Sequence, residues 1–321
     1  MSSIQIQIVT YNSAKTIEAC IKSALEQTGV DFSIVVIDNA SEDNTVDIVE
    51  SLGVPCIRNE TNVGYAVAHN QAFELSKSTY VLTLNPDVYL MPDYLWHLQQ
   101  ALDANPTIGS AAGCLLRVES LEEQPQFVDS TGLLMLRSRR QKLRDDGVPL
   151  GQHHQEEGEI FGPDGAAAFY RRAMLEDIRI EGDIFDSDFF IHKEDVDLCW
   201  RAQLRGWHSI YVPSAIAHHI RSFRPGKRER VSDDLRCYAL RNRYLLMWKN
   251  DIPAHFWRDF PYIFLYDVMI LGYVLLKERK SLAAYRSLWQ LRQKTRHKRQ
   301  MIQQGRKVSW HRIRSAFGGQ R

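Results

Sequence analysis

The chain has 321 residues, of which 25% are charged and 44% are hydrophobic. These proportions are ordinary for a soluble globular protein, and the length allows one large domain or two smaller ones. The cysteines are scattered, odd in number and without a CxxC pair: Cys20, Cys56, Cys114, Cys199 and Cys237. They argue against a disulfide framework and a structural zinc site, and they indicate a reducing, cytoplasmic compartment.

The net charge of +1 hides an asymmetry along the chain. Residues 277–321 contain 14 Lys or Arg and a single acid, Glu278, which leaves 26 basic and 38 acidic residues, a net charge of −12, for the rest. An acidic body with a basic tail indicates that the tail meets an anionic partner.

The first hundred residues alternate between strand and helix patterns. Strands are predicted at 4–9, 33–37, 55–57 and 80–84, and helices follow them at about 17–25, 46–52, 65–76 and 94–102. This alternation predicts an α/β fold with a mostly parallel sheet flanked by crossover helices.

Past residue 105 the strand and helix patterns no longer alternate regularly. Strands are predicted at 109–115, 165–170 and 207–212, and a helix at 194–205 that ends at Gly206. Residues 137–158 are charged and rich in Gly and His, and we expect them to form a mobile loop.

The C-terminal region, 251–321, is predicted to be helical and basic. Residues 260–276 form an apolar run that is marginal for a membrane-spanning helix, so we expect a buried or interfacial helix there. Beyond it, apolar residues recur at helical spacing among Arg and Lys: Leu282, Tyr285, Leu288, Trp289 and Leu291. This pattern fits a helix in a membrane interface and equally a helix packed on the body with a solvated basic face.

Polar groups follow each of the four N-terminal strands. The four segments, in chain order, are Thr10-Tyr11-Asn12, the run from Asp38-Asn39 to Asp43, then Asn62-Val63-Gly64, and finally Asn85-Pro86-Asp87. Ligands of open α/β sheets sit at the carboxyl edge, so these groups predict a nucleotide site. Asp87 is a candidate ligand for a divalent cation that holds a diphosphate. The GxGxxG fingerprint is missing after the first strand, which argues against NAD or FAD.

Two further groups stand in the second half of the chain. Glu194-Asp195-Val196-Asp197 begins the predicted helix, where capping alone accounts for acidic residues but a general base is also suited. His218-His219 follows the last strand, and one imidazole there is a candidate to complete the cation site of Asp87. The segment 161–165 is expected to shape a sugar pocket or simply to pack tightly, and the basic loop from Arg221 to Arg230 to face phosphate.

Taken in order, these segments resemble family 2 glycosyltransferases of the GT-A fold, and more narrowly their bacterial rhamnosyltransferase-like members. The segments that carry the resemblance are 9–12, 36–41, 62–65, 84–87, 165–172 and 194–198, together with Pro213 and His219. The likeness extends over about residues 4–250. It implies a GT-A domain at 1–250, with a nucleotide-binding half at about 1–105 and an acceptor half at about 106–250.

The resemblance also implies roles for individual residues. Asp38 contacts the base or ribose, Asn85 and Asp87 represent the DxD-like motif, Asp195 is the catalytic base, and His219 is favoured over His218 as a metal ligand. The nucleotide-sugar site then comprises Thr10, Tyr11, Asn12, Asp38, Asn39, Asn62, Gly64, Asn85 and Asp87. The pocket for the acceptor or donor sugar comprises Asp164, Gly165, Glu194 and Arg221.

The implied activity is a metal-dependent, inverting transfer of one sugar, with Mg²⁺ or Mn²⁺ as cofactor. The QxxRW signature of processive synthases is missing, which favours single addition. By resemblance the donor is dTDP-rhamnose or else a UDP-hexose, and the acceptor is a lipid-linked glycan of a cell-surface polysaccharide. We therefore expect a protein peripheral on the inner face of the cell membrane.

Three alternatives remain. A nucleotidyltransferase would share the nucleotide-binding half but usually carries a Gly-rich N-terminal loop that this chain lacks. A catalytically dead member of the family would bind sugar nucleotides as a scaffold. A nucleic-acid-binding protein would use the basic tail, but the Leu and Trp residues of the tail follow a single helical face, so no nucleic-acid partner is predicted.

Overall fold

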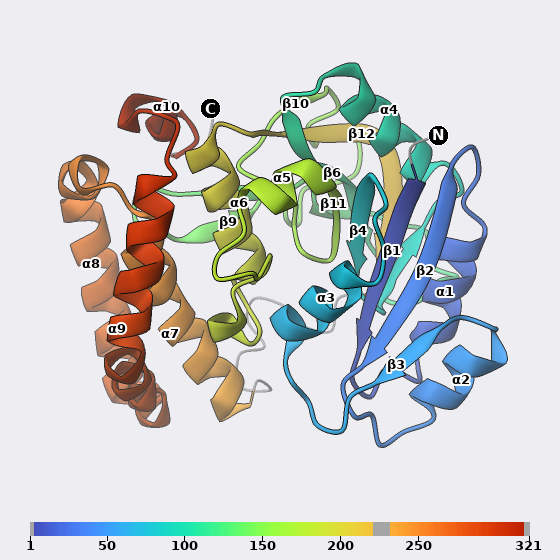
Figure 1. Cartoon of the computed structure of the whole chain (residues 1–321), viewed down its shortest axis with the longest axis horizontal. Coiled ribbons are helices and arrows are strands. Elements are labelled where there is room, and N and C mark those ends of the chain that lie inside the picture. Colours follow the sequence, from blue (N-terminus) through green and yellow to red (C-terminus); the bar gives the residue numbers. More distant parts are fainter. Residues whose placement is uncertain (1–2, 221–231, 318–321) are drawn as a thin grey trace.

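The computed structural model describes residues 3–220 and 232–317. A large mixed sheet forms its centre, with strands in the order β10-β12-β6-β11-β4-β1-β2-β3, while β5 pairs with β12 and β7 with β6 (Figure 1). The strands of this sheet are β1 (Ser3–Thr10), β2 (Asp31–Asp38), β3 (Cys56–Arg58), β4 (Tyr80–Leu84), β5 (Val88–Leu90), β6 (Ile108–Arg117), β7 (Phe127–Ser130), β10 (Gly158–Glu159), β11 (Ala167–Arg171) and β12 (His208–His219).

The N-terminal part of the sheet is parallel, as predicted. β1 pairs in parallel with β2 and β4, and β2 with β3. β11 runs antiparallel between β4 and β6, and β12 returns parallel to β6. All five residues of β4 are buried, which explains its unbroken apolar sequence, since such strands are covered on both faces.

Helices cover the sheet and are amphipathic where the sequence predicts them. The helices of this part are α1 (Ile17–Leu25), α2 (Thr45–Ser51), α3 (Tyr65–Glu74), α4 (Tyr94–Ala104), α5 (Arg172–Asp177) and α6 (Glu194–Arg205). α1 buries Ile17, Cys20, Ile21 and Ala24, one face at helical spacing. α6 ends at Gly206, whose φ of 93° is the left-handed conformation of a C-terminal glycine cap.

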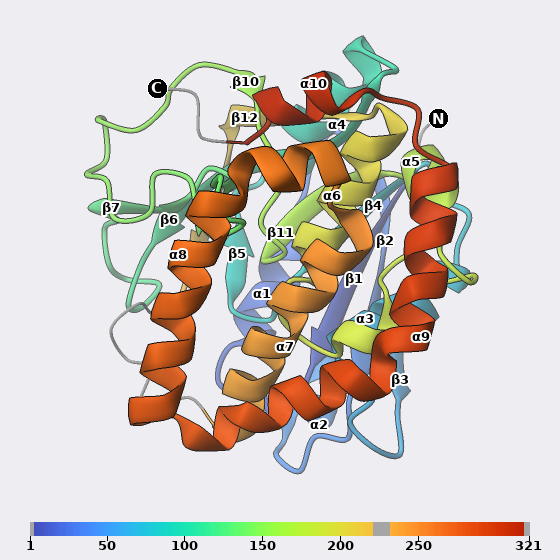
Figure 2. The same cartoon turned by 90° about the vertical axis from the view of Figure 1, so that its left-hand side faces the viewer.

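The C-terminal helices form a separate layer beside the sheet (Figure 2). They are α7 (Asp233–Asn250), α8 (Pro253–Lys277), the short 3₁₀ helix η3 (Arg279–Leu282), α9 (Ala283–Gln304) and α10 (Trp310–Ser315). α9 packs along α7, and Leu288 and Leu291 pack on the same buried cluster as Trp200 of α6. The apolar run 260–276 lies within α8, which begins several residues earlier than predicted.

The segment 137–158 corrects one sequence-based expectation. Instead of a loop throughout, it contains β9 (Gln141–Leu143), which pairs with β8 (Leu133–Met135). Arg139 is only 1% exposed, and its guanidinium forms ion pairs of 2.8 Å with Asp251 and with Asp259. The charge of this segment does not indicate exposure, because carboxylates more than a hundred residues away neutralise it.

We predict that Arg139→Met destabilises the fold by about 3–5 kcal/mol, the usual cost of removing one partner from a buried ion pair. The methionine fills much of the space but leaves Asp251 without its guanidinium partner. Urea unfolding followed by circular dichroism measures the effect. Lys22→Met, which breaks the exposed Lys22–Glu18 pair, is the control and should change stability by less than about 1 kcal/mol. Equal stability of both variants would contradict the prediction.

Candidate active site

The carboxyl ends of β1 and β2 are joined by hydrogen bonds to Asp38. Thr10 Oγ1 donates to Asp38 Oδ1 at 2.9 Å, and Ser41 donates from its backbone N–H at 2.9 Å and from its hydroxyl at 2.5 Å. Asp38 is only 2% exposed. Its two oxygens therefore hold the loop after β2 against the end of β1, at the edge where the sequence predicts a nucleotide.

Tyr11 and Asn12 lie on the adjacent loop. Asn12 has a left-handed φ of 53°, and its backbone N–H donates to Ser41 Oγ while its Oδ1 accepts from the backbone N–H of Glu42, both at 2.8 Å. Tyr11 is 52% exposed. An uncovered aromatic ring beside a fixed polar loop is a surface on which a nucleobase can stack.

Gly64 connects the nucleotide side of the sheet to the segment before α6. Its N–H donates to Asn62 Oδ1 at 3.0 Å, and its carbonyl accepts from the Asn39 side chain at 3.3 Å. Its φ is 87°, and an added Cβ would lie 2.6 Å from the ring and 2.7 Å from the carbonyl oxygen of Phe190. Only glycine allows this approach.

Asp87 and His219 meet at the end of β12. Asp87 Oδ1 lies 3.4 Å from His219 Nε2, and His219 Nδ1 is 2.8 Å from Asp129 Oδ2. Asp129 lies on β7, is fully buried and stands 3.7 Å from the Arg117 guanidinium. Burial alone would lower the pKa of His219, but the hydrogen bond to Asp129 and the nearby carboxylate of Asp87 outweigh it and raise the pKa to about 9.

These residues fit a divalent cation. Asp87 Oδ1 is buried and makes no hydrogen bond, and His219 presents its second nitrogen beside it. Hydrogen bonding of a ligating imidazole to a carboxylate is the usual outer shell of a metal site, and here Asp129 provides it. No cluster of three His, Cys, Asp or Glu ligands occurs within 3–220 and 232–317, so the protein would supply two ligands and leave the rest to phosphate and water.

Asp195 lies in the first turn of α6 and contacts the loop before β11. Its Oδ2 accepts from the backbone N–H of Gly165 at 3.0 Å, and its Oδ1 from the N–H of Val196 at 2.7 Å. The adjacent residue, Ala166, accepts from the N–H of Asn85 at 2.8 Å. The loop 164–166 thus lies between the segment of Asp87 and the start of α6, and it brings together residues more than a hundred positions apart.

Burial and neighbouring negative charge raise the pKa of both carboxylates at this helix start. Burial, and next to it the charge of Asp164, raises the pKa of Asp195. Burial and the charge of Asp195 raise the pKa of Glu194, whose Oε2 is buried without a hydrogen bond. A carboxylate with a raised pKa is a stronger base than an ordinary aspartate, which suits proton abstraction near neutral pH.

A strained segment leads into α6. Phe190, His192 and Lys193 all have left-handed φ, from 62° to 72°, which is costly for residues other than glycine. The fully buried side-chain amide of Asn242, on α7, donates to the carbonyls of Phe189, Ile191 and His192 at 2.8–2.9 Å. One side chain thus satisfies three backbone acceptors of this turn.

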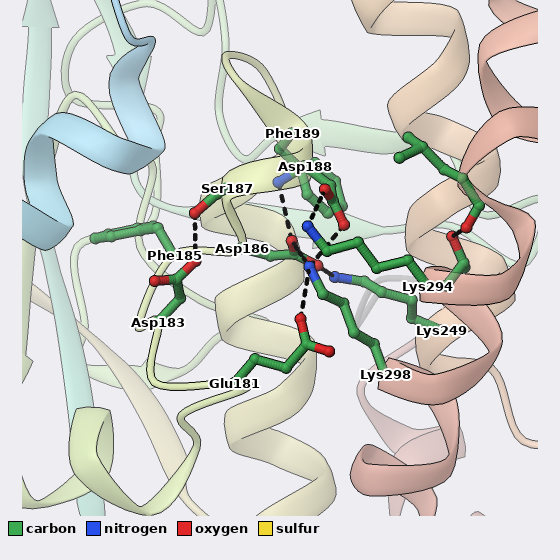
Figure 3. Close-up of polar contacts among 12 residues, drawn as sticks. Glu181, Asp183, Phe185, Asp186, Ser187, Asp188, Phe189, Lys249, Lys294 and Lys298 are labelled. Carbon is green, nitrogen blue, oxygen red and sulfur yellow. Dashed lines mark hydrogen bonds and ion pairs between the residues drawn. The ribbon is translucent and has the colours of Figure 1, made fainter.

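The preceding residues are tied to α7 and α9 by buried ion pairs (Figure 3). Asp186 is in contact with Lys249, and its Oδ1 lies 2.5 Å from Lys298 Nζ. Asp188 pairs with Lys298 at 2.6 Å and with Lys294 at 2.7 Å. Burial would raise the pKa of Asp186, but the charges of Lys249 and Lys298 outweigh this effect and keep the pKa well below its usual range.

Sequence reasoning named neither Asp129 nor Asn242. Asp129 is an acid on a short strand that the irregular middle of the chain concealed, and Asn242 lies within a helix pattern that carries no motif. The only available signal for each was a polar side chain within a buried element. Arg221, which was assigned to the sugar pocket, and the basic loop from Arg221 to Arg230 lie outside the described residues.

A family model, that of glycosyl transferase family 2, matches residues 6–179, more than half of the chain. The chain belongs to glycosyl transferase family 2. Members of this family take a nucleotide-sugar donor and a glycan acceptor. Asp195 and Asn242 lie beyond the matched residues.

Similar proteins include one that is uncharacterized and one that is named as a glucosyltransferase. Protein MT1568 of Mycobacterium tuberculosis is 30% identical over 197 residues, which cover 59% of this chain and 60% of that protein. The UDP-Glc:alpha-D-GlcNAc-diphosphoundecaprenol beta-1,3-glucosyltransferase WfaP of Escherichia coli is 36% identical over 92 residues, or 28% of this chain and 37% of the enzyme. The chain thus spans no more than about three fifths of either relative.

Solved structures share the fold. Mannosyltransferase PcManGT from Pyrobaculum calidifontis, in complex with GDP-Man and Mn²⁺, has a TM-score of 0.53 at 17% identity. The match covers 97% of this chain and 77% of the mannosyltransferase chain. TarS 1-349 of S. aureus has a TM-score of 0.54 at 17% identity, covering 89% and 78%. The predicted family and the GT-A-type α/β fold are therefore confirmed.

We predict that Asn242→Ala lowers kcat for sugar transfer at least about tenfold while the donor KM changes little, because a misplacement of about 1 Å at a catalytic group costs up to about a hundredfold. The matched control is Asn250→Ala, an equally buried asparagine on α7 that donates to Asp197, which Lys249 also holds. A general loss of stability would lower kcat equally in both variants and would contradict the positioning role.

Proposed function

We propose that the protein is an inverting glycosyltransferase that moves a single sugar from a nucleotide donor to a hydroxyl of a lipid-linked glycan. One observation carries this function: loop 164–166 holds Asp195, a carboxylate with a raised pKa, next to the segment of Asp87 and His219. The candidate base for the acceptor hydroxyl, Asp195, is thereby close to the side chains proposed to hold the cation that binds the diphosphate, Asp87 and His219. The donor lies between them.

The nucleotide is expected at the carboxyl edge of β1–β4. Tyr11 offers its exposed ring to the base, and the loops fixed by Asp38, Asn39 and Asn62 present backbone and side-chain polar groups to the ribose and phosphates. Our first choice of donor is dTDP-rhamnose, by resemblance to the rhamnosyltransferase-like branch. A UDP-hexose is next, and the Escherichia coli relative is named for UDP-Glc.

The diphosphate is expected beside Asp87 and His219. A divalent cation, Mg²⁺ or Mn²⁺, held by these two side chains would offset the negative charge that develops on the departing diphosphate. Asp129 orients His219 through Nδ1, and the Asn85 backbone fixes Asp87 relative to the 164–166 loop.

Asp195 is proposed as the general base. It takes the proton of the acceptor hydroxyl as that oxygen forms its bond to the anomeric carbon and the bond from that carbon to the diphosphate oxygen breaks. Attack opposite the leaving group inverts the configuration. The N–H groups of Gly165 and Val196 fix both oxygens of the carboxylate, so its orientation is set before the acceptor binds.

The acceptor is proposed to enter beside Asp164, Gly165 and Glu194. Single addition follows from the missing QxxRW signature. The Escherichia coli relative is named for a diphosphoundecaprenol-linked acceptor, which supports a lipid-linked substrate and a place at the inner face of the cell membrane. A nucleotidyltransferase and a nucleic-acid-binding protein gain no support from the family match. The presence of Asp87, Asp195 and His219 argues against a non-catalytic scaffold.

We predict that Asp195→Asn lowers turnover by about 10²–10⁴-fold, the usual worth of general-base catalysis. The base works only when deprotonated, so wild-type kcat falls as pH drops through its raised pKa, and Asp195→Asn lacks this acid limb. Asp164→Asn removes a neighbouring negative charge, lowers the pKa of Asp195 and moves the limb to lower pH. Near-normal turnover of Asp195→Asn would exclude Asp195 from this role.

Chelation of divalent ions is expected to abolish transfer, and Mn²⁺ to restore it. Asp87→Ala and His219→Ala should each weaken Mn²⁺ binding, measured by electron paramagnetic resonance in the presence of the nucleoside diphosphate. His218→Ala, one position along β12, is the control and should bind Mn²⁺ as the wild type does. Full activity in EDTA would mean that cationic side chains neutralise the diphosphate.

A further inference from the structure

One face of α8 is apolar and open to water. This 25-residue helix has a mean hydropathy of 1.5 over its most apolar window, of which only 17% is buried. Its large apolar side chains that are more than a third exposed are Trp257, Phe260, Tyr262, Phe264, Leu265, Val268, Met269, Leu271, Tyr273, Leu275 and Leu276. Such a face on a soluble body marks an interaction site.

The opposite side of α8 is engaged with the body. Asp259 is fully buried and pairs with Arg137 and Arg139 at 2.8 Å, and Asp267 pairs with Arg243 at 2.9 Å. Spanning a bilayer would break these pairs. The helix therefore offers one face only, which suits a position in the plane of a membrane interface.

Basic side chains surround the end of this face where α8 meets α9. Lys277, Arg279, Lys280 and Arg286 are all exposed there, beside Leu276 at 80% and Trp289 at 68% exposure. The acids of residues 260–290 are Asp267, paired as above, and Glu278, which is buried. Lys280 also pairs with exposed Asp233 of α7 at 2.6 Å. An apolar face with a cationic rim complements anionic lipid headgroups over acyl chains.

A groove opens on the same face. Its volume is about 460 Å³, and its lining comes from α7, α8, η3 and α9: Tyr244, Phe264, Asp267, Val268, Leu271, Leu282 and Tyr285. Apart from Asp267 and the two tyrosines it is aliphatic or aromatic, and Arg243 neutralises Asp267. A hydrocarbon chain is the ligand that such a lining favours.

α8 runs along the side of the molecule away from β1–β3, and only its junction with α9 lies at the same end as the candidate site (Figure 1). In both views the α8–α9 junction lies at the lower end, toward which β1 and β2 point with their carboxyl ends (Figures 1 and 2). We propose that the exposed face of α8 and the basic α8–α9 junction dock on an anionic lipid bilayer, with a lipid hydrocarbon chain in the groove. The docking would present lipid-linked acceptors to Asp195; that consequence alone rests on the proposed function.

The test is sedimentation of the full chain with vesicles of phosphatidylcholine, with and without phosphatidylglycerol, at low and high salt. We expect binding that needs phosphatidylglycerol and weakens with salt. Lys277→Gln with Arg286→Gln should lower the partition coefficient about 25-fold, because each Lys or Arg near the membrane surface contributes about fivefold. Leu265→Glu with Met269→Glu should reduce it further. Leu75→Glu with Lys77→Gln, at two exposed positions just after α3 and outside the proposed surface, should bind as the wild type does.

Brominated acyl chains should quench tryptophan emission, and Trp289→Phe should reduce the quenching. Donor hydrolysis without vesicles is measured in parallel, so loss of activity and loss of docking are separate results. Failure to bind anionic vesicles, or equal binding by the α8 and control variants, would overturn the proposal. So would a dimer in light scattering that Leu265→Glu dissociates while lipid binding stays absent, since a second copy would then cover the face.

Discussion

The buried ion pairs around Asp186 determine how the C-terminal helices meet the rest of the molecule. Lys249 of α7 and Lys298 of α9 both reach this carboxylate, and all three side chains are nearly fully buried. Desolvation offsets most of the attraction in such a cluster, but removal of one partner costs about 3–5 kcal/mol. The network therefore specifies the register more than it adds stability, because any slip of α9 along α7 would bury an unpaired charge.

This constraint reaches the candidate base. Asp186 begins the turn that passes through the left-handed residues Phe190, His192 and Lys193 into α6, and Lys249 also pairs with Asp197 of α6 at 2.9 Å. Asn242 holds the turn between these points. The placement of Asp195 thus depends on α7 and α9, although the family model ends at residue 179. A bilayer that bound α8 and the start of α9 would act on helices already joined to this turn.

Sequence reasoning succeeded where the information is local. The strands ending at Thr10, Asp38 and Leu84 are rich in Ile, Val and Leu and are buried at their carboxyl ends, so both the sheet and the convergence of their polar ends could be predicted. Arg139 and Asp129 could not be placed, because their partners lie far away in the chain and no spacing rule connects them. For the same reason α8 was expected to be buried or interfacial, and only its surroundings show that most of its apolar residues are exposed.

The carboxylates at the start of α6 are the clearest local conflict in the molecule. Burial and the charge of Asp164 raise the pKa of Asp195, burial and the charge of Asp195 raise the pKa of Glu194, and Glu194 Oε2 is buried without a hydrogen bond. Three left-handed residues precede Glu194, and the charge of Lys193, which donates to Gln141, opposes these shifts without outweighing burial. Such an arrangement weakens the fold, and structural capping needs only one acid. Its persistence is understandable if a basic carboxylate must be fixed in orientation before substrates arrive, since the polar environment then need not reorganise during the reaction.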